Sequence, residues 1–412
     1  MKTSGLLLIV LLTWPAAAQG FSAASMRRLE LEETCSLALG RSEQLGRQAE
    51  GVAQLDAAER QFGAAFRPSF DFNASLSKQQ NADTAAKGYF SGSYNLFSGM
   101  RDYLSAKAAS ARTGAARLDL DRARQLLYLS AAQAYLNLLA AQREVFIRAG
   151  QLEVTARRIA ELEARAAIGR SRKSEVVAAR SQLAQDKAGY LASVSDERLA
   201  QQALKFLTGL SEDLAPAELP ARAPAAPEAY LKLALSRPDV QAKRREAETY
   251  GYLADIEVQS KWPALNLAAN YYVLRTPAPD PVNRWDAGAF LNLPLYTGGR
   301  LQAKKDSAYS AKRSASLALD QAQRQALSEV RSAYEEFTYS ARQAASLEEA
   351  LTLAEENARY QQEDYKMGLV NNLDVLSALN TAQQTRLALS QARARSSLAL
   401  IKLETSAGAE LK

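Results

Sequence analysis

The stretch "LPLYTGGRLQAKK", residues 293–305, joins a strand-like apolar segment to a long charged segment without glycine. The stretch "YNLFSGMRDYLSA", residues 94–106, has the same layout. Arg101 and Arg300 align at an offset of 199 residues. The same offset pairs Tyr135 with Tyr334, Gly169 with Gly368, Val176 with Val375 and Gly209 with Gly408. Matches in one register over so long a span indicate that the chain is an internal duplication.

A strand, glycines and a helix are also the layout of a phosphate-binding loop. Lys304 and Lys305 follow Gly299 at the wrong spacing for such a loop, and the pattern G-x-x-x-x-G-K-[ST] occurs nowhere in the chain. We therefore interpret Gly99, Gly298 and Gly299 as the places where a strand turns into a helix. The twin stretches share one glycine, because the first reads Ser-Gly-Met where the second reads Thr-Gly-Gly.

Each half begins with a helical pattern and continues with two strands. In 69–77, Phe70, Phe72, Ala74 and Leu76 alternate with polar residues. In 265–273 the apolar set is Leu265, Leu267, Ala269, Tyr271 and Val273. Such alternation predicts strands with one apolar and one polar face. The expected strands are 69–77, 89–97, 265–273 and 285–295, and the expected leading helices are about 25–63 and 228–259.

A very long helix is expected after each pair of strands. The segment from Arg300 to Met367 contains neither proline nor glycine and would be about 100 Å long as a helix. Apolar residues recur along it at spacings of three and four, which is typical of coiled-coil packing. Gly169 and Gly368 are expected to end the two long helices, and return helices follow at 172–208 and 371–406.

The N-terminus has the pattern of a secretory signal peptide. Lys2 precedes the apolar run 6–12, and the small residues 16–18 form a cleavage site of the Ala-x-Ala type. No later stretch reaches the roughly 20 apolar residues of a spanning helix. We expect an exported protein with a signal peptide at 1–18, a first repeat at 19–209, a linker at 210–227 and a second repeat at 228–412.

Composition narrows the possible chemistry. The 412 residues include no histidine and one cysteine, which excludes histidine-based catalysis, histidine metal sites and an intramolecular disulfide. Cys35 is expected to be buried on a helix face with Leu31 and Leu39. The net charge is +6, but the basic residues alternate with acids along helical faces, so a nucleic-acid partner is not expected. We expect no enzyme activity, no catalytic residues, no bound metal and no cofactor.

Four strands with one apolar face cannot close a barrel alone, because a barrel needs about eight or more strands. The apolar and polar alternation is that of membrane barrels, and sharing would give eight strands from two chains or twelve from three. A soluble β-sandwich fragment packed on the helices is the alternative. The expected fold class is mainly α, with long antiparallel hairpins that form a tunnel and with strands contributed to a shared β-barrel.

The order of these features resembles the TolC-type outer-membrane efflux protein family. The resemblance covers the mature chain and includes "LELEETCSLAL" at 29–39, "LFSGMR" and "LYTGGR" at the two junctions, and "YKMGLVNNLDVLSAL" at 365–379. It implies a homotrimer with a 12-stranded barrel in the lipid of the Gram-negative outer membrane and a helical tunnel in the periplasm. It also implies two partners, a periplasmic adaptor (membrane fusion) protein and an inner-membrane transporter.

The resemblance implies a gate at the periplasmic tip. Asp374 matches the first of two family carboxylates that constrict the lumen, whereas Ser377 stands at the second position. Tyr365 matches a family aromatic that holds the tip closed, but Val370 replaces the expected basic partner, and Asn371 and Asn372 are the alternative partners. A plain helix N-terminal acid is the competing interpretation of Asp374.

The turns of the two hairpins match the family's adaptor-docking tips. The first turn is Ile168, Gly169 and Arg170, and the second is Met367, Gly368 and Leu369. Helix-ending glycines are the simpler interpretation of the same residues. The first turn is basic and the second nearly neutral, which predicts contact with unequal adaptor surfaces.

The sequence therefore predicts a passive exit duct of a tripartite efflux or type I secretion system, in which the lumen and gate control passage. A periplasmic coiled-coil adaptor or scaffold is the alternative, but it predicts one hairpin rather than a duplicated one. An envelope hydrolase is a third class, and it would need a cluster of acids that the sequence does not show.

Overall fold

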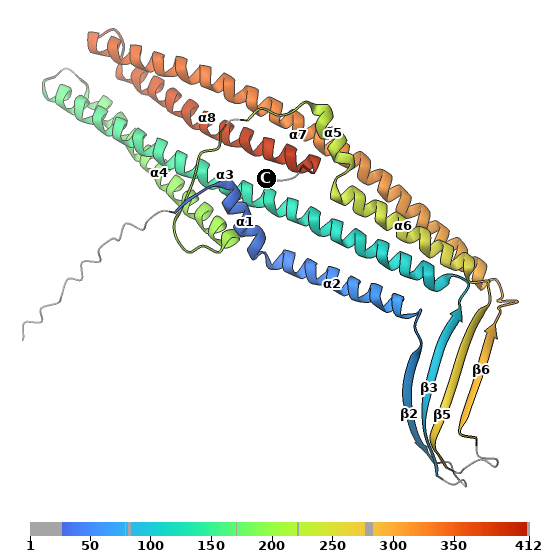
Figure 1. Ribbon diagram of the computed structural model, residues 1–412. Coiled ribbons are helices and arrows are strands. Elements are labelled where there is room, and N and C mark those ends of the chain that lie inside the picture. The colour runs from blue at the N-terminus through green and yellow to red at the C-terminus, as the bar shows by residue number, and fades with distance from the viewer. Residues whose placement is uncertain are drawn as a thin grey trace, which may run out of the picture.

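The computed structural model describes residues 27–78, 80, 84–169, 171–220, 222–276 and 283–409. The predicted signal peptide at 1–18 and the tip residue Arg170 lie outside the described residues. Long helices run side by side away from one end of a four-stranded sheet, and two hairpin turns form the opposite end (Figure 1). Among the described helices, none is long and apolar enough to cross a membrane.

Both halves contain the same series of main elements. The first half has β1 (Arg27–Leu29), α1 (Leu31–Arg41), α2 (Glu43–Ala64), β2 (Ser69–Ser77), β3 (Ala85–Phe97), α3 (Arg101–Ala167) and α4 (Lys173–Thr208). The connection contains β4 (Leu214–Pro216). The second half has α5 (Pro227–Leu235), α6 (Pro238–Gln259), β5 (Ala264–Thr276), β6 (Trp285–Asn292), α7 (Arg300–Met367) and α8 (Asn372–Ala407). The predicted order is confirmed: leading helix, two strands, long helix, return helix.

Two predicted helices are interrupted. The helix expected at 25–63 is broken at Ser42, whose hydroxyl accepts from the Leu45 amide and caps α2 with a distance of 3.2 Å. The helix expected at 228–259 is broken before Pro238, because a proline inside a helix removes one hydrogen bond and clashes with the preceding turn. The strand expected at 285–295 stops at Asn292, two residues before Pro294.

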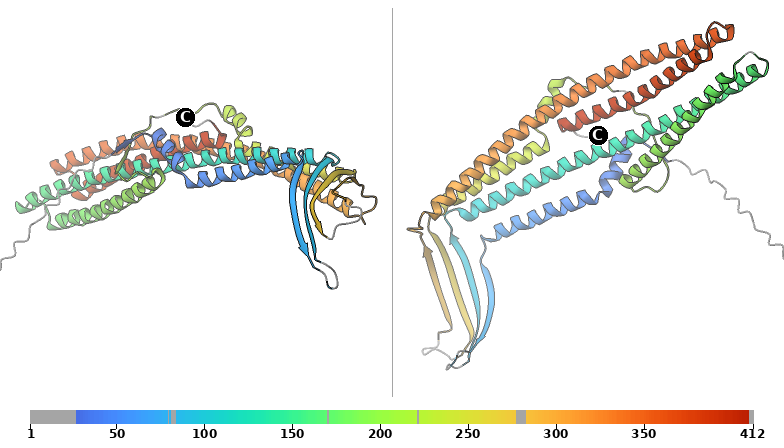
Figure 2. Two further views of the ribbon diagram at one scale, coloured as in Figure 1. Left: turned by 60° about the horizontal axis from the view of Figure 1, so that its bottom comes forward. Right: turned by 180° about the vertical axis from the view of Figure 1, so that it is seen from behind.

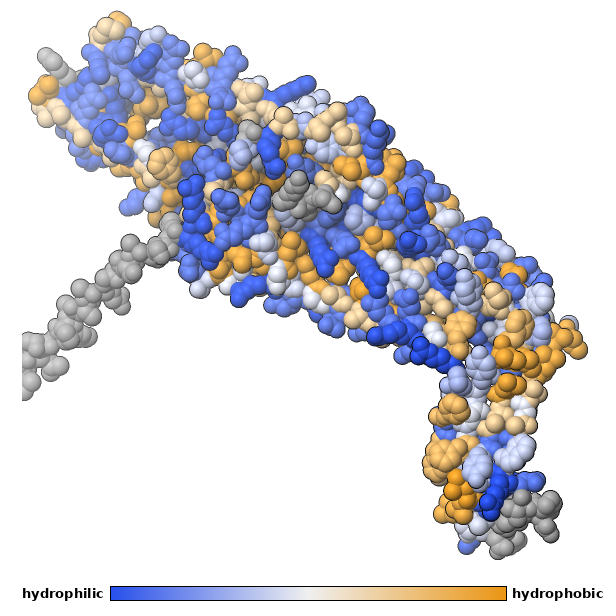
Figure 3. Space-filling view, viewed as in Figure 1, coloured by the Kyte–Doolittle hydropathy of each residue, from blue (hydrophilic) through white to orange (hydrophobic). Residues whose placement is uncertain are grey.

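The sheet has the order β2-β3-β5-β6 and is antiparallel throughout. Paired residues share a face, so Phe72, Phe90, Tyr271 and Trp285 form one row of the apolar face. These rings are exposed, and orange patches follow the sheet in the space-filling view (Figure 3). The opposite face is polar: the Ser69 and Ser93 hydroxyls hydrogen-bond at 2.8 Å, and Asn73 donates to Ser91 at 2.8 Å.

One prediction about the sheet is wrong in detail. The alternation expected through Val273 stops at a bulge between Gly88/Tyr89 of β3 and Leu274/Tyr272 of β5. An extra residue in one strand reverses the side-chain alternation beyond it. Leu274 therefore lies on the apolar face, opposite Gly88, and the next residue, Arg275, turns to the polar face.

The helices form one curved layer (Figure 2). Near the sheet the neighbours are α2, α3, α6 and α7, in that order, and we call this the sheet-proximal layer. Near the hairpin turns the order is α4, α3, α8 and α7, and we call this the tip-proximal layer. In both layers α7 is the edge on one side, and α2 or α4 is the edge on the other. The layer thus has two open sides, as the sheet has in β2 and β6.

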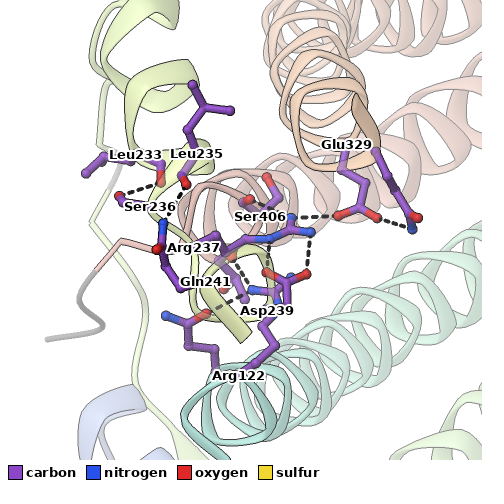
Figure 4. Close-up of polar contacts among 12 residues, drawn as sticks. Arg122, Leu233, Leu235, Ser236, Arg237, Asp239, Gln241, Glu329 and Ser406 are labelled. Carbon is purple, nitrogen blue, oxygen red and sulfur yellow. Dashed lines mark hydrogen bonds and ion pairs between the residues drawn. The ribbon is translucent and has the colours of Figure 1, made fainter. Parts of the chain in front are cut away.

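A buried arginine joins the start of α6, the middle of α7 and the end of α8 between these layers (Figure 4). The Arg237 guanidinium, 3% exposed, donates to Asp239 at 2.7 and 2.8 Å, to Glu329 at 2.7 Å and to the Ser406 carbonyl at 2.9 Å. Burial alone would lower the pKa of Arg237, but the hydrogen bonds to the two carboxylates outweigh it and raise the pKa. The second arginine, Arg122 on α3, donates to a neighbouring carbonyl of α8.

The first half uses an arginine in the same way. Arg41, the last residue of α1, donates from Nη1 to the Gly209 carbonyl oxygen at the end of α4 at 2.6 Å. Arg237 correspondingly follows α5 and contacts the end of α8. A cation at the C-terminus of a helix satisfies its free carbonyls and the helix dipole. The duplication therefore extends to the way in which each return helix is anchored.

The main core lies where α1, α3 and the short strands meet. Tyr135 is fully buried, and its hydroxyl lies 3.0 Å from the Leu29 carbonyl oxygen and 2.8 Å from that of Ala217. Leu29 belongs to β1, which pairs in parallel with β4, a contact that the sequence did not predict. Cys35 is buried beside this core, as expected, and burial, assisted by Glu32, raises the pKa of its thiol to about 12. A thiol so protonated is not a nucleophile at neutral pH.

Candidate functional site: the hairpin tips and the strand-to-helix junctions

Both hairpin turns use a glycine in the left-handed region. Gly169 has φ 74° and Gly368 has φ 81°. At the second turn, the Gly368 amide donates to the Tyr365 carbonyl and the Leu369 amide donates to the Asp364 carbonyl, the two bonds of a Schellman motif. The glycines thus end their helices as predicted. Three apolar side chains of the turns are exposed: Ile168, Met367 and Leu369.

Asn371 and Asp374 form a capping box at the start of α8. The Asn371 side chain accepts from the Leu373 amide at 2.8 Å and the Asp374 amide at 3.2 Å, and the Asp374 carboxylate accepts from the Asn371 amide at 3.2 Å. Asp374 therefore has the helix-capping function of the simpler interpretation. Asp374 and Ser377, which lies one turn later, are both exposed on α8. A role of either in a lumenal constriction stays a prediction.

Two arginines of the other hairpin lie against the ring of Tyr365. The guanidinium carbon of Arg158 lies 4.1 Å from the centroid of the Tyr365 ring, and that of Arg165 lies 4.9 Å from it. Glu161 accepts from both, at 2.8 Å from Arg158 and 2.9 Å from Arg165. Cations stacked on a tyrosine attract the ring electrostatically. The basic partner absent at Val370 is thus supplied by α3.

Arg158 also contacts Asn372, the first residue of α8. Its Nε donates to the Asn372 Oδ1 at 3.0 Å, and both side chains are buried. Within the described residues, Arg158 Nη2 and Asn372 Nδ2 have no hydrogen-bond acceptor. A buried donor without an acceptor costs roughly 1–3 kcal/mol. The contact of Arg158 with Tyr365 and Asn372 is therefore attractive, but it also leaves two buried donors without acceptors.

The structure brings together only part of the predicted gate. Tyr365 and Asn372 meet at Arg158, whereas Asn371 and Asp374 contact each other and Ser377 is separate. The sequence prediction missed Arg158 and Arg165. A signal was present, because two arginines seven residues apart occupy one face of a helix. The partner, however, lies more than 200 residues away in the other repeat.

The strand-to-helix junctions use two consecutive left-handed residues in each repeat. Gly99 and Met100 have φ 65° and 66°, and Gly298 and Gly299 have φ 61° and 83°. The first amides of α3 and α7 donate to the Ser98 and Thr297 carbonyls in the same way. The two junctions therefore correspond residue for residue at the offset of 199 in backbone conformation, with Met100 in the position of Gly299.

The two junctions differ in their surroundings. A Cβ on Gly99 would lie 2.7 Å from the Trp262 Cβ and 3.3 Å from the Gln259 carbonyl oxygen. No atom lies within 4 Å of a Cβ placed on Gly298. Gly99 is thus required by contact with the end of α6 as well as by its backbone conformation.

Among the described residues, no three His, Cys, Asp or Glu side chains cluster in a way that could hold a metal ion. The contacts at the tips and junctions are instead helix caps, cation–aromatic stacks and close backbone packing. These arrangements hold and orient the ends of helices.

Comparison with known proteins agrees with the fold. The family model described as outer membrane efflux protein matches residues 230–409, which is the second repeat. This half of the chain is thus similar to outer membrane efflux proteins. A relative named outer membrane efflux protein BepC, from Brucella suis biovar 1 (strain 1330), is 24% identical over 338 residues, covering 80% of this chain and 74% of BepC.

Solved structures of outer-membrane and channel-forming proteins share the fold of this chain. VceC from Vibrio cholerae matches with a TM-score of 0.82 and 23% identity, covering 93% of this chain and 97% of VceC. CusC matches with a TM-score of 0.84 and 19% identity, and the match covers 92% of each chain. The open state of MtrE from Neisseria gonorrhoeae matches with a TM-score of 0.79 and 20% identity, and the match covers 93% of this chain and 89% of MtrE. The resemblance predicted from the sequence is confirmed: the chain is similar to outer membrane efflux proteins in sequence and shares its fold with outer-membrane channels.

Proposed function

We propose that three copies of this chain close into one ring, with a 12-stranded barrel in the outer membrane and a helical tunnel in the periplasm. The single observation that supports this most strongly is that the sheet and both helical layers have their unpaired edges on the same two sides of the protomer. The sheet is open at β2 and β6, the sheet-proximal layer at α2 and α7, and the tip-proximal layer at α4 and α7. One side consists of first-half elements and the other of second-half elements, so one rotation joins all three levels.

The ring would also satisfy both faces of the sheet. An exposed row of aromatic rings suits lipid, and the hydrogen-bonded serine and asparagine rows suit a water-filled lumen. Unpaired strand edges in a membrane would leave backbone groups without partners, and closure removes both edges. We propose no catalytic step, because the inferred work is exclusion and gating along a lumen.

We infer that the hairpin tips are the gate and that they meet a periplasmic adaptor. The Arg158 contact with Tyr365 and Asn372 joins the two hairpins of one protomer near their turns. Separation of the hairpins would break this contact and widen the tip. An adaptor and an inner-membrane transporter complete the export system, and the transporter supplies the energy. The duplicated hairpin and the membrane-type sheet disfavour the alternative of a soluble periplasmic scaffold.

The experiment that tests the ring uses introduced cysteines, because the natural Cys35 is buried. One cysteine would replace Asn73 on β2 and the other would replace a residue of β6 in turn, from Ala287 to Leu291. We expect oxidation to produce a covalent trimer for at least one pair in membranes, since β6 of one protomer would lie beside β2 of the next. The purified protein should also form discrete channels in planar bilayers. A detergent-free soluble monomer without conductance would contradict the proposal.

The tip glycines provide a prediction about docking. Replacing Gly368 with Val is expected to reduce export several-fold while the trimer still assembles, because a β-branched residue is strained at φ 81° and the turn would change shape. The measurement is efflux of a fluorescent substrate together with the yield of trimer in membranes. Gly51, a helical glycine with no neighbour near its Cβ, is the control position. Normal efflux in Gly368→Val would exclude the turn as a docking element.

A further inference from the structure

The four membrane-type strands contain four charged residues: Asp71 on β2, Lys87 on β3, Arg275 on β5 and Asp286 on β6. All four lie on the polar face, because Lys87 pairs with Arg275 and the two aspartates belong to the row of Asp71, Ser91, Asn270 and Asp286. The acids are on the edge strands and the bases on the central strands. The polar face therefore carries charge in two separate rows.

The basic row is an unfavourable arrangement for the sheet alone. Lys87 and Arg275 are directly opposite each other on neighbouring strands, and like charges in that position destabilise an antiparallel pair. Lysines often protect the open edge of a sheet, but β3 and β5 are both paired on their two sides, so that explanation does not apply. Within the described part of the chain, neither cation forms an ion pair with a carboxylate. The repulsion between Lys87 and Arg275 is not offset by any contact within the described sheet, which indicates that the two cations have a function.

The bulge in β5 places the second cation in this row. Regular alternation from Leu265 would put Arg275 on the apolar face, toward lipid, and the bulge before Leu274 reverses it. Bulges commonly re-aim a side chain in this way. Arg275 then covers Tyr272, with the guanidinium carbon 4.9 Å from the ring centroid, and Tyr272 packs on Tyr89 at 5.4 Å between centroids. The cation is thus held above an aromatic pair.

We propose that Lys87 and Arg275 form a basic belt near the outer end of the pore that favours the passage of anionic solutes over cations. The inference rests on the proposed function, because a ring of three protomers would place six cations around one level of the lumen. The row of Asp71 and Asp286 lies four residues nearer the junction along β3, about 13 Å away between backbone positions. The charge of the lumen therefore changes sign along the barrel, and the belt is the last charged level of the strands that an exported solute meets.

The test is the reversal potential of single channels in planar bilayers under a KCl gradient. In about 0.1 M salt, where screening extends over roughly 10 Å, the double variant Lys87→Gln with Arg275→Gln is expected to lower the chloride-to-potassium permeability ratio about twofold or more. The exchange variant Lys87→Arg with Arg275→Lys keeps both charges and should keep the wild-type ratio. In 1 M salt the difference between the variants should disappear, because the screening length falls to about 3 Å.

Three results separate this inference from the proposed function. An unchanged reversal potential in the double variant at low salt, with channels of normal conductance, would overturn the basic belt and leave the exit duct intact. A shift of equal size in the exchange variant would also overturn it, because side-chain shape rather than charge would then be responsible. Absence of any conductance from the wild-type trimer would overturn the proposed function and the belt together.

Discussion

Asn372→Asp is expected to hold the periplasmic tip closed and to reduce export about tenfold. The carboxylate would accept from Arg158 Nε, as the amide does at 3.0 Å, and could also accept from Nη2, which has no acceptor within the described residues. A bidentate pair is stronger than one bond to a neutral amide. The new charge also lies at the first residue of α8, where the helix dipole favours an anion. Satisfying one buried donor is worth roughly 1–3 kcal/mol, and 1.4 kcal/mol is tenfold in an equilibrium.

Asn371→Asp is the matched control for this change. It adds the same charge one residue earlier, at an exposed position whose side chain caps α8, and aspartate caps helices as well as asparagine does. Asn372→Ala should act in the opposite direction, because it removes the acceptor of the buried guanidinium. The measurements are single-channel conductance and efflux of a fluorescent substrate. Wild-type conductance in Asn372→Asp, or equal loss in Asn371→Asp, would show that Arg158 does not hold the tip.

The elements best predicted from the sequence are those that local pattern determines. The strand at 69–77 and the helix from Arg300 to Met367 have the predicted bounds, because alternation and the absence of proline and glycine act over neighbouring residues. The repeat offset also aligned the two junctions correctly, since Gly99 and Gly298 both adopt the left-handed conformation. Local preference and repetition were sufficient for the architecture of one protomer.

The contacts that the sequence did not predict are those between distant segments. The pairing of β1 with β4 involves three residues in each strand and joins the N-terminal segment to the linker, so no periodic pattern marks it. The stack of Arg158 on Tyr365 depends on how two long helices from different repeats are aligned along their axes. That alignment follows from the packing of α8 against both α3 and α7, which spacing within any one helix does not specify.

The bulge in β5 is a third case of this kind. Its position depends on which residue of β3 faces which residue of β5, and those strands come from different repeats. The sequence of β5 alternates smoothly through Val273 and gives no local sign of an extra residue. The side on which Arg275 lies was therefore not predictable from its own strand, although it decides whether that charge is on the apolar or the polar face of the sheet.

Gly99→Ala is expected to destabilise the protein far more than Gly298→Ala, although the two glycines are equivalent in the repeat. Alanine at either position adopts a left-handed conformation that costs roughly 1–2 kcal/mol. Only at Gly99 would the new methyl group also lie 2.7 Å from the Trp262 Cβ, so α6 and the start of α3 would have to move apart. Overpacking of this kind adds about 1–3 kcal/mol. The measurement is the midpoint of thermal unfolding of the purified protein in detergent, together with its yield in membranes.

Met100→Gly completes the comparison, because it restores in the first repeat the residue that the second repeat has at Gly299. Met100 has φ 66° and is exposed, so glycine removes backbone strain at little loss of packing, and we expect the free energy of unfolding to rise by about 1 kcal/mol.

If contact with Trp262 determines the difference between Gly99→Ala and Gly298→Ala, Trp262→Ala should not rescue Gly99→Ala, since the clash is with the Cβ that alanine retains. Trp262→Gly, which removes that Cβ, should rescue it partly. Equal destabilisation by Gly99→Ala and Gly298→Ala would mean that backbone strain alone governs both junctions, and that the close approach of α6 to Gly99 gives way at little cost.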